Sequence, residues 1–199
     1  MIRRFRPEDL AELRRICLLT GDGGADATGR WSSDELLPEV FLEPYVRLEP
    51  EHAWVVEQDA RAVGYLVATL DTRAFVARWR ASWTPDFAAR YSRVADDPAE
   101  QWLRDLGYEP ERMLSAALGE YPAHLHIDLL PEAQGRGHGR ALMRQLGLAA
   151  VEAGVPGIHL FVGADNRGAR TFYERLGFRE LSATAETVQL GVAPEQLVR

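Results

Sequence analysis

A strand, a glycine-rich loop and a helix that follow one another constrain the fold of this chain more than any other feature. HLHIDLL (124–130) has strand character, and residues 140–153 have the apolar spacing of an amphipathic helix. The loop between them carries glycine at alternate positions, Gly135, Gly137 and Gly139. Glycine lets a backbone approach a ligand closely and adopt conformations that other residues resist. The segment therefore predicts a strand and a helix joined by a loop that contacts a ligand.

The ligand that this loop suits is an anion. Successive amides at the start of a helix, reinforced by the helix dipole, form a site for a diphosphate. Arg136 and Arg140 add positive charge there. The alternative is a tight strand-to-helix turn that needs glycine for its geometry alone.

The rest of the chain alternates between strand and helix patterns. Asn166 is placed to cap the helix that Gly177 ends. The glycine-rich loop 21–29 is expected to be mobile, either as a lid over a site or as a plain surface connection. The expected order is strand 2–6, helix 7–19, a helix starting at 32–35, hairpin strands 53–58 and 62–71, helical residues 72–122, strand 124–130, helix 140–153, strand 158–162, helix to 176 and a strand region 178–190. This alternation predicts an α/β fold in one domain, residues 1–199, with a helical insert at about 72–122.

Composition excludes several classes of function. All 23 basic residues are arginine, against 30 acidic residues, so the formal net charge is −7. Without lysine there is neither a GxxxxGK[ST] phosphate loop nor Schiff-base catalysis. The acidic balance argues against nucleic-acid binding and leans towards a cationic substrate.

Cysteine count and hydropathy limit the remaining possibilities. Cys17 is the only cysteine, which rules out an intrachain disulfide and thiolate zinc sites, and no metal site is expected. No apolar run has the 18 or so residues that a membrane span needs, and MIRRF is not followed by the apolar core of a signal peptide. We therefore expect a soluble, cytoplasmic protein that does not bind membranes.

Two motifs in the second half of the chain resemble those of a known superfamily. Gln134-x-x-Gly137-x-Gly139 is similar to the pyrophosphate-binding motif of the GCN5-related N-acetyltransferase (GNAT) superfamily, and Val162 to Phe178 resembles its second signature. The resemblance implies an α/β fold with a mixed, mostly antiparallel twisted sheet and helices on both faces, and it places the helical insert of about 72–122 between strands 3 and 4. It also implies acetyl-CoA as co-substrate. A dinucleotide-dependent oxidoreductase would need a third glycine where Arg140 stands.

A narrower resemblance covers more of the chain. Residues 2–17, the helical insert and residues 126–142 are similar to the acetyltransferase-like domain at the C-terminus of O-GlcNAcase and to its free-standing bacterial relatives. Most superfamily members join the third and fourth strands by a short hairpin, so the insert of about fifty residues departs from the common plan.

The resemblance implies which residues contact acetyl-CoA. The strand before the loop would supply backbone amides, the loop would bind the diphosphate, and Asn166 would complete the site. The expected contacts are Leu129, Leu130, Gln134, Gly135, Arg136, Gly137, His138, Gly139, Arg140 and Asn166.

Tyr173 matches the tyrosine that the superfamily places beside the sulfur as general acid. The alternative is a packing role, because Ala169, Phe172, Tyr173 and Leu176 form one stripe of a helix.

The general base is sought on the central strand. Alternation places His124, His126 and Asp128 on one face of residues 124–130. Buried polar groups are costly without partners or purpose. Asp128, which is nearest the expected position of the acyl group, is the first candidate for a base or amine-orienting group, and His126, whose ordinary pKa of about 6.5 suits the task, is the second. The alternative is that these groups bond to one another or to the insert. Glu120 is a more remote candidate.

These residues predict an acetyl-CoA-dependent N-acetyltransferase that acts on a small-molecule or protein amine by direct attack in a ternary complex. Cys17 has core neighbours at helical spacing, which argues against an acyl-enzyme. The alternative function is a non-catalytic acetyl-CoA-binding module that has lost a competent acceptor site.

Overall fold

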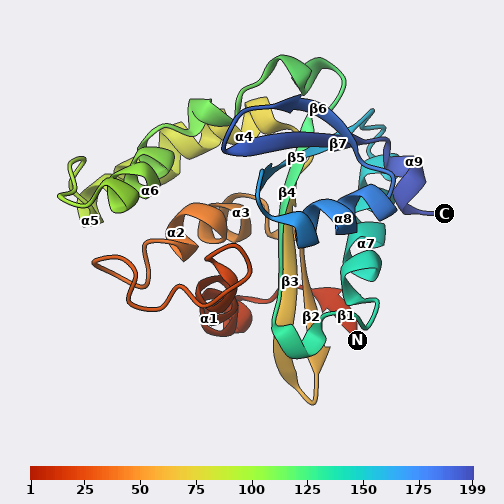
Figure 1. The fold of residues 1–199 in the computed structure, drawn as a ribbon, viewed down its shortest axis with the longest axis horizontal. Coiled ribbons are helices and arrows are strands. Elements are labelled where there is room, and N and C mark those ends of the chain that lie inside the picture. Colours follow the sequence, from red (N-terminus) through yellow and green to blue (C-terminus); the bar gives the residue numbers. More distant parts are fainter.

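The computed structural model describes residues 1–199, built around a seven-stranded sheet (Figure 1). The strand order is β1-β2-β3-β4-β5-β7-β6, and every neighbouring pair is antiparallel except the parallel pair β4–β5. The strands are β1 Ile2–Arg4, β2 Ala53–Gln58, β3 Arg61–Thr69, β4 Ala123–Leu129, β5 Ile158–Gly163, β6 Arg179–Ala183 and β7 Thr187–Val192. The predicted mixed, mostly antiparallel sheet is confirmed.

The helices are distributed along the whole chain. They are α1 Leu10–Thr20, α2 Pro38–Phe41, α3 Glu43–Leu48, α4 Thr72–Arg78, α5 Thr84–Arg90, α6 Pro98–Tyr108, α7 His138–Glu152, α8 Arg167–Arg175 and α9 Pro194–Leu197. A π-helical turn, Trp79–Trp83, joins α4 to α5, and short 3₁₀ turns cover 7–9, 50–52, 110–113, 116–119 and 131–133. None of these helices has both the length and the apolar character that crossing a bilayer requires.

Two predicted elements differ from the structure. The helix expected to start at 32–35 begins only at Pro38, because Ser32 donates from its backbone N–H and its hydroxyl to Glu100 of α6 instead of capping a helix. The single strand region expected from 178 to 190 is a hairpin of β6 and β7, with β7 inserted between β5 and β6.

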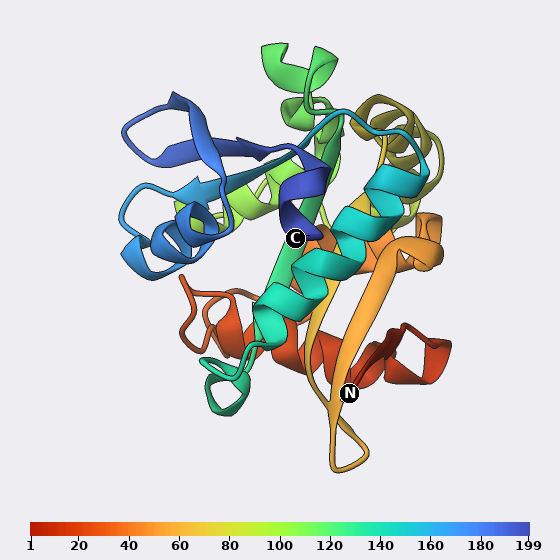
Figure 2. The ribbon, with the colours of Figure 1, turned by 90° about the vertical axis from the view of Figure 1, so that its right-hand side faces the viewer.

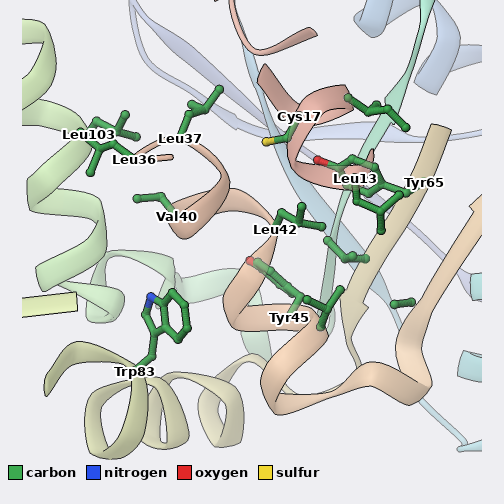
Figure 3. Packing of buried hydrophobic residues seen from close by; sticks show 14 of the residues in the cluster. Leu13, Cys17, Leu36, Leu37, Val40, Leu42, Tyr45, Tyr65, Trp83 and Leu103 are labelled. Atoms are coloured by element: carbon green, nitrogen blue, oxygen red, sulfur yellow. The ribbon is translucent and has the colours of Figure 1, made fainter. Parts of the chain in front are cut away.

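Helices cover both faces of the sheet. One core cluster joins Leu13 and Cys17 of α1, Tyr45 of α3 and Tyr65 of β3 with side chains of the helical insert such as Trp83 (Figure 3). The other face is covered by α7, α8 and α9, and α7 crosses it obliquely (Figure 2). The residues of β4 therefore alternate as predicted, since Asp128, His126 and His124 are paired with Tyr65, Val67 and Thr69 of β3.

The insert between β3 and β4 is helical, as predicted, and extends from the top of the sheet alongside α2 (Figure 1). Its aromatic residues are mostly buried, and they pack within the insert and against the neighbouring helices: Trp83 Nε1 donates to the Glu39 carbonyl of α2, and Phe87 packs on Tyr108 of α6. Trp102 differs, because it is 50% exposed and packs against Phe41 of α2 with ring centroids 6.4 Å apart.

The parallel pair β4–β5 opens soon after it begins. Its only paired positions are Ala123 with Ile158 and His124 with His159. Beyond them β4 continues alongside β3, whereas β5 turns away with β6 and β7 (Figure 1). The backbone of β4 from residue 125 onward thus has no strand on its β5 side, and the opening becomes a cleft.

Candidate active site

A cleft of about 1050 Å³ fills the opening between β4 and β5. Its walls come from α1, α2, β4, the glycine-rich loop, β5 and α8. Loop 21–29 also borders it, through Gly21, Gly23, Gly24 and Ala25. This loop contacts α8 directly, because Asn166 Nδ2 donates to the Gly23 carbonyl at 3.4 Å.

The loop before α7 presents an unbroken run of unused amides. Gly135 and Gly137 have φ of 70° and 82°, which is the left-handed region that favours glycine. The backbone N–H groups of residues 135 to 140 have no acceptor in the protein, since the neighbouring bonds run from Gln134 to Pro131 and from Ala141 to Gly137. Six successive donors at the start of a 15-residue helix form a strong anion site.

Side chains around this loop support the same geometry. Arg136 and Arg140 are exposed at its edge, and His138 is partly exposed in the first turn of α7. A Cβ on Gly139 would lie 3.0 Å from the Phe172 ring, so a bare Cα here allows α7 to approach α8. These residues fit a diphosphate, the charged part of acetyl-CoA.

The two leucines expected to supply amides have different roles. The Leu130 N–H donates to the Val63 carbonyl at 3.0 Å, so this amide belongs to the β3–β4 pairing and its side chain is buried. The expectation that Leu130 contributes an amide to the cleft is therefore wrong. Because hydrogen-bonding direction alternates along an antiparallel strand, the Leu129 N–H faces β5 and the cleft. The Leu129 carbonyl accepts from Gln134 Nε2 at 3.0 Å, which ties the loop to β4.

Asn166 caps α8 as predicted. Its Oδ1 accepts from the Ala169 N–H at 3.0 Å, and its Nδ2 reaches Gly23. Asn166 borders the cleft, and contact with acetyl-CoA stays a prediction for this residue.

Asp128 lies on the wall that β4 contributes to the cleft. Its Oδ2 accepts from the Tyr65 hydroxyl at 2.5 Å. Burial raises the pKa of Asp128 above its usual value, and the hydrogen bond from Tyr65 opposes this rise. A carboxylate with a raised pKa is a better proton acceptor than an ordinary surface aspartate.

Tyr173 lies on the opposite wall, on α8, and is 8% exposed. Burial, reinforced by the negative charge of Asp128, raises the pKa of its phenol. The tyrosine therefore keeps its proton over the working pH range. Tyr173 is also part of the core stripe with Leu176 and Phe172, so this residue both packs in the core and borders the cleft.

His126 reaches the cleft, whereas His124 does not. His126 Nε2 lies 3.1 Å from the Tyr45 hydroxyl, and burial lowers the pKa of His126 to about 4. His124 is buried, with its two ring nitrogens 2.7 Å from the Tyr45 and Thr72 hydroxyls. Glu120 is not among the residues that line the cleft.

Two tyrosines that sequence reasoning missed hold these polar groups. Tyr65 bonds to Asp128, and Tyr45 lies between His124 and His126. Tyr65 could have been found by aligning the hairpin strand with β4, since the two residues are cross-strand neighbours. Tyr45 is far from β4 in the sequence, and no pattern linked it to the histidines.

Comparison with known proteins agrees with this geometry. Residues 23–178 match the profile of the acetyltransferase (GNAT) family. The crystal structure of SsHAT superimposes on this chain with a TM-score of 0.93, at 42% sequence identity and with 98% of both chains covered.

Two curated relatives are longer than this chain. Protein O-GlcNAcase of Rattus norvegicus is 24% identical over 186 residues, which cover 91% of this chain and 20% of that protein. Mycothiol acetyltransferase of Pseudarthrobacter chlorophenolicus is 32% identical over 158 residues, covering 71% of this chain and 43% of that protein. The chain thus matches about a fifth of the first protein and less than half of the second, and both predicted resemblances are confirmed. The chain belongs to the acetyltransferase (GNAT) family.

Proposed function

We propose that this protein is an acetyl-CoA-dependent N-acetyltransferase that transfers the acetyl group to an amine by direct attack within a ternary complex. One observation carries the proposal: the loop of free amides, through Gly135, Gly137, Gly139 and Arg140, borders the same cleft as Asp128 and Tyr173. The loop expected to bind the diphosphate and the two candidate acid–base residues, Asp128 and Tyr173, are therefore parts of one site.

Each residue has a role in this proposal that follows from its surroundings. Bound acetyl-CoA would supply the thioester that is the acetyl donor. The amides of 135–140 would hold its diphosphate, and the Leu129 N–H would donate to the thioester carbonyl oxygen. One such donor to an oxygen that gains charge typically contributes about 3 kcal/mol to catalysis.

Residues on two walls of the cleft, Asp128 on β4 and Tyr173 on α8, act on the proton of the amine and on the leaving sulfur. Asp128 orients the acceptor amine and takes its proton, with His126 as the second candidate. The Tyr173 hydroxyl donates a hydrogen bond to the sulfur as it leaves. An untuned phenol has a pKa of about 10 against about 8.5 for a thiol, so a strong hydrogen bond is favoured over full proton transfer.

An acyl-enzyme on Cys17 is disfavoured by the surroundings of the thiol. Cys17 is 2% exposed, and burial raises the pKa of its thiol. The thiolate is the nucleophilic form, so this thiol is a poor acyl acceptor.

The experiment that tests the proposal measures release of free coenzyme A thiol from acetyl-CoA across a panel of small and peptide amines. We expect amine-dependent release with one acetylated product per thiol. Tight binding of acetyl-CoA with no release for any amine would contradict catalysis and favour the non-catalytic acetyl-CoA-binding module.

Replacing Tyr173 by phenylalanine separates turnover from binding. We expect Tyr173→Phe to lower kcat about 10- to 100-fold, the effect of one lost hydrogen bond to a charged group, with the affinity for acetyl-CoA unchanged. Tyr108→Phe is the matched control, because Tyr108 is 9% exposed, lies in the insert and donates to the Tyr91 carbonyl. Equal activity of Tyr173→Phe and the wild type would refute the assigned role.

The exposed Trp102 is expected to affect the choice of acceptor. It packs on Phe41, which borders the cleft and lies against His126 with ring centroids 5.2 Å apart. We expect Trp102→Ala to change the relative kcat/KM of different amines by about fivefold while the affinity for acetyl-CoA stays within twofold, since it alters about 1 kcal/mol of apolar contact. Val94→Ala, an exposed apolar residue elsewhere in the insert, is the control. Parallel losses for every amine and for acetyl-CoA would contradict the assignment.

A further inference from the structure

A chain of hydrogen bonds runs from the backbone at the start of β4 to the histidine that borders the cleft. It connects the Pro122 carbonyl, the Thr72 hydroxyl, His124, the Tyr45 hydroxyl and His126. The chain crosses from the insert through β4 to α3, where the Tyr45 ring is packed in the core (Figure 3). Because each hydroxyl has a single hydrogen, the direction of every bond can be worked out from one fixed end.

The fixed end is the Pro122 carbonyl. It lies 2.6 Å from Thr72 Oγ1, and a carbonyl can only accept, so the Thr72 hydrogen points to it. His124 Nδ1, which is 2.7 Å from the same oxygen, must then donate to Thr72. Burial lowers the pKa of His124 well below its usual value, so this ring is neutral and its Nε2 has no hydrogen.

The same reasoning passes through Tyr45 to the cleft. His124 Nε2 accepts the hydrogen of the Tyr45 hydroxyl at 2.7 Å, and the Met113 sulfur, 3.8 Å away, is the weaker acceptor. With that hydrogen used, the 3.1 Å contact between Tyr45 and His126 requires His126 Nε2 to be the donor. Neutral His126 then has a lone pair on Nδ1.

We propose that Thr72, His124 and Tyr45 are positioning residues that hold His126 as the tautomer with hydrogen on Nε2, so that its Nδ1 lone pair is presented to the cleft. His126 Nδ1 has no hydrogen-bond partner in the protein, and it is not fully buried. His126 also borders the cleft. The tautomer assignment stands on the hydrogen-bond chain together with a neutral His124, whereas its use in catalysis rests on the proposed acetyl transfer.

This tautomer determines which hydrogen-bonding groups the cleft offers to the amine that accepts the acetyl group. Asp128 lies two residues further along the same face of β4, and its Oδ2 already accepts from Tyr65. His126 Nδ1 and the Asp128 carboxylate therefore both offer lone pairs and no hydrogen. The two groups fit an amine nitrogen, the acceptor of the acetyl group, that donates one hydrogen to each of them. If Asp128 does not take the proton of this amine, His126 Nδ1 can take it.

The test is the tautomeric state of the histidines, read from two-bond ¹H–¹⁵N spectra of the ¹⁵N-labelled protein. We expect wild-type His124 with hydrogen on Nδ1 and His126 with hydrogen on Nε2. Tyr45→Phe removes the acceptor of His126 Nε2–H, so we expect His126 to become a mixture of tautomers and kcat to fall about tenfold, with KM for acetyl-CoA unchanged. Tyr108→Phe, which also removes a largely buried phenol, is expected to leave both spectra and kcat unchanged.

A second pair of variants acts at the other end of the chain. Thr72→Val removes the acceptor of His124 Nδ1–H, so we expect the tautomers of His124 and His126 to change, whereas Thr72→Ser keeps the hydroxyl and restores the wild-type spectrum. A wild-type spectrum with hydrogen on Nδ1 of His126, or one that neither Tyr45→Phe nor Thr72→Val alters, overturns the proposal. The expected tautomers in a protein that acetylates no amine would support the positioning chain and contradict the proposed function instead.

Discussion

Gly137→Asp is expected to abolish binding of acetyl-CoA while the protein stays folded. The substitution places a carboxylate among the free amides of 135–140, where a diphosphate is proposed to bind. Two like charges about 4 Å apart repel by roughly 4 kcal/mol at the edge of a protein, so we expect at least a 100-fold loss of affinity. Isothermal titration calorimetry of acetyl-CoA into the variant measures this loss.

Gly154→Asp is the matched control for this variant. Gly154 follows the C-terminal end of the same helix, has φ of 67° against 82° at Gly137, and, like Gly137, has open space around its Cα. Both variants should therefore lose a similar amount of stability, about 1 kcal/mol, from a non-glycine residue in the left-handed region. Undiminished affinity in Gly137→Asp, or equal loss in both variants, would refute the assignment of the loop.

Asp128→Asn is expected to lower kcat about 10²- to 10⁴-fold, the usual contribution of a positioned general base. The amide keeps the shape of the carboxylate and an oxygen that can accept from Tyr65, so the surrounding contacts are retained. The binding of acetyl-CoA should be unchanged, because the diphosphate contacts lie in the loop. A variant that retains near-wild-type kcat would exclude Asp128 as the base and leave His126 as the candidate.

The pH dependence of kcat in the wild type and in Asp128→Asn gives an independent check on the role of Asp128. Catalysis requires the ionised carboxylate, so wild-type kcat should fall as pH drops through the raised pKa of Asp128, and this acid limb should vanish in Asp128→Asn.

A carboxyl whose pKa is raised on folding stabilises the fold below its unfolded pKa, and this contribution is lost as pH rises through the folded pKa. At neutral pH the Asn variant should therefore unfold at the same or a higher temperature than the wild type.

The sequence was informative where local chemistry determines the structure. The glycines of 135–139 predicted the loop and its free amides, and alternation along 124–130 correctly grouped His124, His126 and Asp128 on one face. Asn166 was predicted as a cap because capping depends on the residues next to it.

What the sequence did not predict depends on contacts between distant segments. The Leu130 amide is used by Val63, and this pairing follows from the register of two strands separated by the whole insert. Ser32 bonds to Glu100, which delays α2 until Pro38. The partners of Asp128 and His126, Tyr65 and Tyr45, also come from elements that only the tertiary fold brings together.

We propose that the free amides of 135–140 bind the diphosphate of acetyl-CoA at the cleft between β4 and β5. Calorimetric titration of the wild-type protein with acetyl-CoA and, separately, with acetylpantetheine, which has no diphosphate, tests it most directly. We predict one acetyl-CoA bound per chain, with an affinity at least 100-fold higher than that of acetylpantetheine. No binding of acetyl-CoA, or equal affinity for the two compounds, would contradict the account.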